Sequence, residues 1–206
     1  MAQGKYAVAQ QTFDQVYFDL PGELPPKLAL GLAAEAAGNL KLAMQMYDLV
    51  SHTDPSYTAA AFGLSRCLRA LGKRSDAVTA LERIPHTSSL HTRSRVEIAN
   101  TLIDNSNGAP VANELQEASK VVETLTLDGI ERYRLAKQVL ETALNLITSK
   151  QLSPTDTISI LGQPLEEVHL RTGLEKALRN MAHLCAGDEK IQLVDEANRV
   201  RPKTWV

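Results

Sequence analysis

Five side chains have types and spacings that could do chemistry, but each also has a plainer explanation. His86 and His91 flank the turn IPHTSSLHT and could share a metal ion, yet no third ligand lies near them in the sequence, and solvated loop histidines explain them equally. Ser65 follows Gly63 in a GLS triplet, but no second glycine stands where a nucleophile elbow needs one. Glu166 and Glu167 are adjacent, so on a helix they point to different faces, where acidic side chains favour the N-terminal turn. These residues therefore predict no metal site and no catalytic site.

Cysteine usage, charge and hydropathy narrow the class of protein. Cys67 and Cys185 are the only cysteines in 206 residues, too few for a disulfide framework or a Cys-rich metal site, so we expect buried, reduced thiols. The formal net charge of -2 argues against a nucleic-acid binder. No apolar run approaches the ~20 residues that span a membrane, and no secretory signal opens the chain. We therefore expect a cytoplasmic protein without nucleic-acid or membrane partners.

The strongest pattern is an internal repeat whose copies begin at evenly spaced glycines. The stretch GKYAVAQQTFDQVYFDLP, which starts at Gly4, matches GNLKLAMQMYDLVSHTDP, which starts at Gly38, and a third copy follows at the same offset. The recurring positions carry a glycine, an alanine, an aromatic residue or leucine, and a proline: Gly4, Gly38 and Gly72; Ala9, Ala43 and Ala77; Phe13, Tyr47 and Leu81; Pro21 and Pro55. Glycine permits a tight turn, alanine lets two helices approach closely, and proline ends the helix. Each copy therefore predicts the second helix of an antiparallel pair.

The helices that precede these glycines repeat as well, so the unit is a helix-turn-helix with a period of about 34 residues. This unit resembles the tetratricopeptide repeat, which implies an all-α solenoid of antiparallel helix pairs. A chance amphipathic bundle is the alternative, but it would not keep the glycine, alanine and aromatic positions in one register with a fourth position, which carries Val16, Val50 and Ile84. The first copy starts at the turn before its second helix. We therefore expect that the chain has been cut from a longer protein that supplies the missing helix.

The C-terminal part keeps helical patterns but loses the markers. A long helix is predicted from residue 127, then a loop in QLSPTDTISILGQP, where Pro154, Gly162 and Pro164 break the pattern, and then two more helices. Trp205 either folds back onto the last helix or anchors an interface. We expect tetratricopeptide repeats over residues 1–126, the first one truncated, and atypical capping helices over 127–206 that extend the same solenoid.

A binding groove is predicted from the repeat register. In tetratricopeptide stacks the first helix of each pair lines the inner groove, and the side chains at those positions are Leu28, Leu32, Phe62, Arg66, Arg69, Arg93, Val96 and Asn100. An apolar patch with three arginines would suit an extended peptide of acidic character. In the alternative interpretation, Arg66 and Arg69 only solvate an exposed helix, and Leu28 and Phe62 contact a neighbouring helix.

Four segments carry a closer resemblance: FDQVYFDLPGELPPKLALGLAAE, AAFGLSRC, SILGQP and LVDEANRVRP. In this order they resemble the C-terminal region of the actinobacterial serine/threonine protein kinase G family. The resemblance implies a parent protein with a rubredoxin-like metal module and a kinase domain that uses ATP and Mg. It also implies repeats that serve dimerisation and kinase organisation, and control of glutamate and 2-oxoglutarate metabolism through a forkhead-associated regulator protein. The implied partners are the kinase domain of the same chain, that regulator and a second protomer.

This chain lacks the sequence motifs of the enzyme itself. It contains no G-x-G-x-x-G loop, no H-R-D or D-F-G motif and no C-x-x-C pair, so no catalytic residue and no cofactor are assigned to it. The first interpretation is therefore a non-catalytic protein-interaction region of a kinase, which also docks substrates. A stand-alone adaptor that binds an extended peptide in its groove is the alternative. An independent enzyme is the third, and it lacks a converging set of nucleophile, base or metal ligands.

Overall fold

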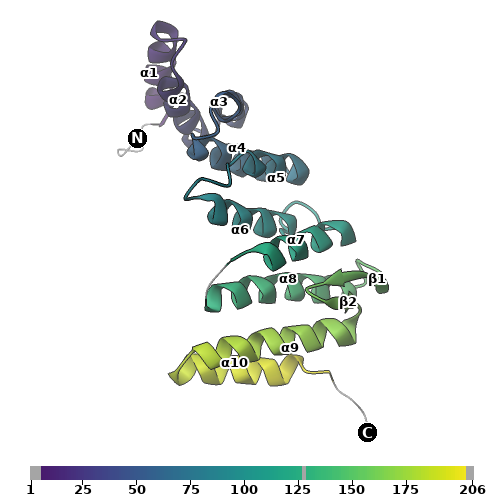
Figure 1. The fold of residues 1–206 in the computed structure, drawn as a ribbon. Helices are drawn as coiled ribbons and strands as arrows, with labels where there is room; N and C mark the ends of the chain where they lie inside the picture. The colour runs from purple at the N-terminus through teal and green to yellow at the C-terminus, as the bar shows by residue number, and fades with distance from the viewer. Residues whose placement is uncertain (1–5, 127–128, 203–206) are drawn as a thin grey trace. The chain divides into compact units, whose positions relative to one another are not determined.

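A computed structural model describes residues 6–126 and 129–202, so the predictions for Gly4 and Trp205 lie outside the described residues. The chain forms two compact units, residues 1–94 and 95–206 (Figure 1). The boundary expected at residue 126 follows the repeat markers and stays a prediction. No helix within the described ranges is long and apolar enough to cross a membrane.

Unit 1 is built from antiparallel helix pairs. Its helices are α1 (Tyr6–Asp19), α2 (Leu24–Ala36), α3 (Leu40–Thr53), α4 (Thr58–Ala70) and α5 (Arg74–Glu82), and α6 (His91–Leu102) begins in it. Gly38 and Gly72 turn the chain between the helices of each pair with φ of 80° and 71°, which only glycine adopts readily. Ala43 and Ala77 are completely buried, as expected for close helix contacts. The all-α class and the helix pairs are thus confirmed in this unit.

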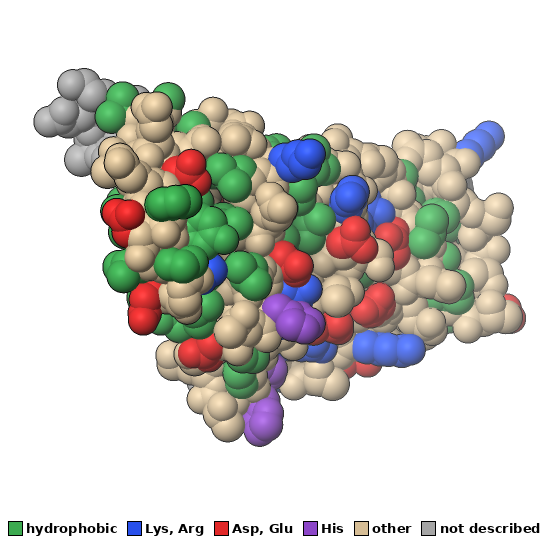
Figure 2. Space-filling view, turned by 90° about the horizontal axis from the view of Figure 1, so that it is seen from above, with side chains coloured by type: hydrophobic (Ala, Val, Ile, Leu, Met, Phe, Trp, Pro, Cys, Tyr) green, Lys and Arg blue, Asp and Glu red, His purple; other side chains and the backbone are tan. Residues whose placement is uncertain are grey.

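The first copy of the repeat is less buried than the others. Ala9 and Phe13 on α1 are half-buried, and no residue of α1 is fully buried. Val8 and Phe18 on the same helix are 59% and 83% exposed. Figure 2 looks down on this end of unit 1, and hydrophobic side chains gather at the left, where Figure 1 places α1. Pro21 and Pro55, which follow the helices, are exposed.

Lys27 holds the turn between α1 and α2. Its side chain is buried, and its Nζ donates hydrogen bonds to the carbonyl oxygens of Pro21 and, at 3.0 Å, Glu23. The same ammonium lies 5.4 Å from the centre of the Tyr17 ring on α1, within cation–π distance. One side chain therefore links α2 to the turn and to α1.

We expect Lys27→Met to keep the apolar stem but loosen α1. Loss of the charged donor should lower the free energy of unfolding by about 1.5 kcal/mol, the usual contribution of hydrogen bonds from a charged group. The measurement is amide hydrogen exchange, which should accelerate in residues 8–20. Lys73→Met, at an exposed position, is the matched control. Unchanged exchange in α1 would contradict this role of Lys27.

Unit 2 contains the remaining elements. They are α7 (Ala112–Thr124), α8 (Ile130–Thr148), β1 (Thr155–Ile160), β2 (Gln163–Leu165), α9 (Glu167–Leu184) and α10 (Gly187–Val200). Helix α9 packs against both α8 and α10. Val139, Leu170 and Leu178 are completely buried between these helices and belong to the core of this unit. The helices predicted for the C-terminal part are confirmed.

The loop predicted between α8 and α9 is wrong, because the chain forms a β-hairpin there. Strands β1 and β2 pair antiparallel, with Ile160 opposite Gln163. Leu161 and Gly162 both have positive φ, 51° and 74°, as a two-residue type I′ turn requires. Ile160 and Leu165 are completely buried, so the hairpin belongs to the core of unit 2. A hydrogen bond attaches the tip of the hairpin to α7: the Leu161 amide donates to the Ser119 hydroxyl at 2.7 Å.

Candidate functional site

The predicted groove residues divide between the two units. Leu28, Leu32, Phe62, Arg66, Arg69 and Arg93 lie in unit 1, whereas Val96 and Asn100 lie in unit 2, where both are half-buried. In unit 1 the side chains of Leu28 and Leu32 on α2 are half-buried and pack against the hydrophobic core. They therefore both stabilise the core and present apolar surface.

Arg66 is held by a carboxylate within unit 1. Its Nε and Nη2 donate to the two oxygens of Glu35, each at 2.8 Å, so the contact is bidentate and joins α4 to α2. The hydroxyl of Tyr47 on α3 donates to the same carboxylate at 2.6 Å. Half of the Arg66 side chain remains exposed. A partner carboxylate would therefore have to share Arg66 with Glu35.

The ionisation of this cluster follows from its contacts. Burial opposes ionisation of Glu35, but hydrogen bonds from Arg66 and Tyr47 outweigh burial and hold the Glu35 pKa below its ordinary value. Burial, and then the hydrogen bond to Glu35, raise the pKa of Tyr47. The hydrogen bond to Glu35 also raises the pKa of Arg66. The cluster therefore consists of a carboxylate, a guanidinium and a neutral phenol at neutral pH.

The remaining groove residues of unit 1 include an aromatic–cation pair. The guanidinium of Arg93 lies 5.4 Å from the centre of the Phe62 ring, where an arginine gains cation–π attraction. Arg93 is exposed, and Phe62 and Arg69 are half-buried. Phe62 and Arg93 therefore present an apolar face next to a positive charge.

The Tyr47 ring lies between two helix glycines that sequence reasoning missed. A Cβ added to Gly63 on α4 would lie 2.5 Å from the ring, and one added to Gly31 on α2 would lie 2.9 Å from it. The ring is completely buried. The signal was present in the sequence, because glycine inside a helix costs about 1 kcal/mol relative to alanine and therefore needs a packing reason.

The residues singled out for chemistry do not form a reactive site in the described structure. Ser65 is buried inside α4, His86 is exposed and His91 is half-buried. Burial raises the pKa of the Cys67 thiol to about 11, so this cysteine is a protonated core residue at neutral pH. Within residues 6–126 and 129–202, no three His, Cys, Asp or Glu side chains come together as a metal site.

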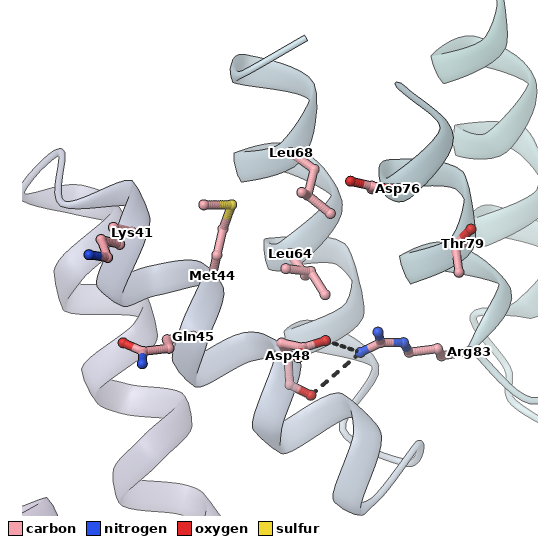
Figure 3. Close-up of a pocket in the computed structure, with 9 residues that line it drawn as sticks. All are labelled: Lys41, Met44, Gln45, Asp48, Leu64, Leu68, Asp76, Thr79 and Arg83. Atoms are coloured by element: carbon pink, nitrogen blue, oxygen red, sulfur yellow. Dashed lines mark hydrogen bonds and ion pairs between the residues drawn. The ribbon is translucent and has the colours of Figure 1, made fainter. Parts of the chain in front are cut away.

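A second surface feature, which the sequence did not suggest, lies between α3 and α5. Both helices pack on α4 and leave a hollow of about 410 Å³ between them, the α3–α5 hollow. Its floor is Leu64 and Leu68 of α4 (Figure 3). Phe62 and Arg66 stand two residues from Leu64 in either direction, about 200° around the helix. Leu64 therefore lies on the side of α4 away from Phe62 and Arg66.

Comparisons with known proteins match the chain to one family along its length. It is 36% identical over 201 residues to the serine/threonine-protein kinase PknG of Mycobacterium leprae, with 97% of this chain aligned. It is 34% identical over 204 residues to PknG of Mycolicibacterium smegmatis, with 98% aligned. The chain spans 26% of the length of each of these relatives. Among solved structures, it resembles MamA with a TM-score of 0.49 and 13% identity, over 97% of this chain and 90% of that one.

The sequence profile described as protein kinase G tetratricopeptide repeat matches residues 1–204. The relatives are serine/threonine kinases, but no catalytic domain is evident in this chain, which corresponds to their repeat region. This agrees with the repeat register, the positive φ of Gly38 and Gly72 and the buried alanines at the helix contacts. The chain therefore belongs to the protein kinase G tetratricopeptide repeat family.

Proposed function

We propose that this chain is the non-catalytic protein-interaction region of a serine/threonine protein kinase of the G type. The observation that carries this proposal is the family match over residues 1–204. The groove residues of unit 1 could bind an extended peptide with acidic residues. Apolar side chains of such a peptide would contact half-buried Leu28 and Leu32, and its carboxylates would face the Phe62–Arg93 pair. Such a region raises the local concentration of a partner near the kinase.

The proposed partners follow the family resemblance. They are the kinase domain of the same protein, a forkhead-associated regulator protein and a second protomer. Through them the region would organise the kinase, support dimerisation and dock substrates in the cytoplasmic control of glutamate and 2-oxoglutarate metabolism. ATP and Mg would be bound by the kinase domain and not by the repeats.

The first test is a charge reversal at the groove. Arg93→Glu should weaken binding of a purified forkhead-associated regulator about tenfold, which corresponds to ~1.4 kcal/mol, because an acidic segment would then face a like charge. Arg93 is the better choice than Arg66, because an added carboxylate at position 66 would lie against Glu35. The measurement is fluorescence anisotropy at low salt.

Lys190→Glu on α10 makes the same charge change at an exposed position of unit 2 and should leave binding unchanged. Equal affinities for wild type and Arg93→Glu would rule out the groove of unit 1 as the docking site. Sequencing the gene upstream of the Met1 codon separates the proposal from its alternative. A kinase reading frame supports it, whereas a stop codon supports a stand-alone adaptor.

A further inference from the structure

The α3–α5 hollow has the size and construction of a binding site. Its volume of about 410 Å³ falls within the range of roughly 300–1,000 Å³ typical of ligand sites in proteins. Leu64 and Leu68 form an apolar floor that is fixed by the core, being only 4% and 8% exposed. The hollow opens to solvent between two helices, so its shape suits a segment laid across it better than an enclosed small molecule.

An ion pair closes one end of the hollow. The Nη1 atom of Arg83, the residue directly after α5, lies 2.7 Å from a carboxylate oxygen of Asp48 on α3, and it also donates to the Ser51 hydroxyl at 2.9 Å. Figure 3 shows this bridge spanning the space between the two helices. The pair neutralises its own charges and fixes the distance between the walls. The net charge that a ligand meets in the hollow is therefore set by the side chains at its other end.

At the other end, one charge stands on each wall. Lys41 is in the first turn of α3, and Asp76 is in the first turn of α5. Figure 3 shows Asp76 reaching from α5 toward Leu68. Both side chains are exposed, and neither makes an ion pair with another described residue. The hollow thus presents a positive wall, a negative wall and an apolar floor.

Met44 adds an adaptable apolar surface to the α3 wall. Its side chain is half-buried at the edge of the hydrophobic core and lines the hollow. Methionine is flexible and polarisable, so it can repack around different apolar side chains. An incoming leucine, methionine or phenylalanine would therefore contact Met44, Leu64 and Leu68.

We propose that the α3–α5 hollow docks an amphipathic helix of a partner protein. This helix inserts one long apolar side chain into the hollow, and in the partner's sequence that residue stands between an acidic and a basic residue. A helix seats readily in a groove between two others. The residues before and after the inserted side chain point about 100° to either side of it. An acidic neighbour would then face Lys41 on α3, and a basic neighbour would face Asp76 on α5. This surface is separate from the groove of the proposed function.

The test uses stapled helical peptides, each about four helical turns long, with one central Leu. Peptides with Glu-Leu-Lys, Lys-Leu-Lys, Glu-Leu-Glu and Glu-Ser-Lys centres are titrated against the chain, and the Met44 methyl signal is followed by NMR. We expect Glu-Leu-Lys to bind about fivefold more tightly than either like-charged peptide, as one exposed ion pair allows. The Glu-Ser-Lys peptide should leave the Met44 signal unmoved.

Charge variants of the walls then test the assignment. Lys41→Glu makes both walls acidic and should shift the preference to Lys-Leu-Lys. Asp76→Lys should shift it to Glu-Leu-Glu, and both changes are at exposed positions where circular dichroism can verify the fold. Equal affinity for all Leu peptides, or no Met44 response, would overturn the proposal. So would a Met44 shift that depends on protein concentration without peptide, because a second copy of the chain would then be the occupant.

Discussion

Gly63→Ala should lower the free energy of unfolding by about 2 kcal/mol, within the range of overpacked cores. The added Cβ would lie 2.5 and 2.6 Å from two atoms of the Tyr47 ring. The ring has no room to withdraw, because Gly31 of α2 lies against it on the other side. Alanine is a better helix former than glycine by about 1 kcal/mol, so a net loss of stability means that overpacking outweighs that gain.

The measurement for Gly63→Ala is urea unfolding followed by circular dichroism, with amide exchange of α2 and α4 to assign the change to unit 1. Gly22→Ala is the matched control, because nothing lies within 4 Å of a Cβ added there. The control should unfold at the wild-type urea concentration or slightly above it. A wild-type midpoint for Gly63→Ala would mean that overpacking against the Tyr47 ring costs no more than the ~1 kcal/mol that alanine gains as a helix former, and it would contradict this prediction.

Tyr47→Ala should lower the free energy of unfolding by more than Gly63→Ala does, by about 3–5 kcal/mol, as expected for removing a large buried ring. The side chain is completely buried and contacts α2 and α4 through the two glycines. Its loss leaves a cavity that small neighbours cannot fill. The same unfolding measurement applies, and unit 1 should lose its cooperative transition well before unit 2.

Tyr47→Phe separates the ring from its hydroxyl. The free energy of unfolding of this variant should fall by only about 1 kcal/mol, the net contribution of one hydrogen bond. The loss is small because Glu35 keeps both hydrogen bonds to Arg66. Tyr6→Ala, at a residue that is 41% exposed, is the control for tyrosine removal and should change stability by less than about 0.5 kcal/mol. If Tyr47→Phe were as damaging as Tyr47→Ala, the hydroxyl and not the ring would be the main source of stability.

Local rules account for what could be predicted about the fold. Gly38 and Gly72 were expected at tight turns and have positive φ, and Ala43 and Ala77 were expected at close contacts and are buried. The hairpin at Thr155–Leu165 escaped prediction because glycine and proline signal a break in a helix but do not say what replaces it. Its turn also places Leu161 at positive φ, which sequence preference disfavours.

The sequence by itself determined the repeat, the helix pairs and the family, because each depends on residue types at fixed spacings along the chain. Only the tertiary structure decided what the exposed side chains do. Arg66 was predicted as a groove residue, but its carboxylate partner Glu35 stands 31 positions away on another helix. At the α3–α5 hollow, Asp48 likewise forms an ion pair with Arg83, which stands 35 positions away. Such contacts depend on how α2, α3, α4 and α5 pack in three dimensions, and periodicity within one helix carries no information about them.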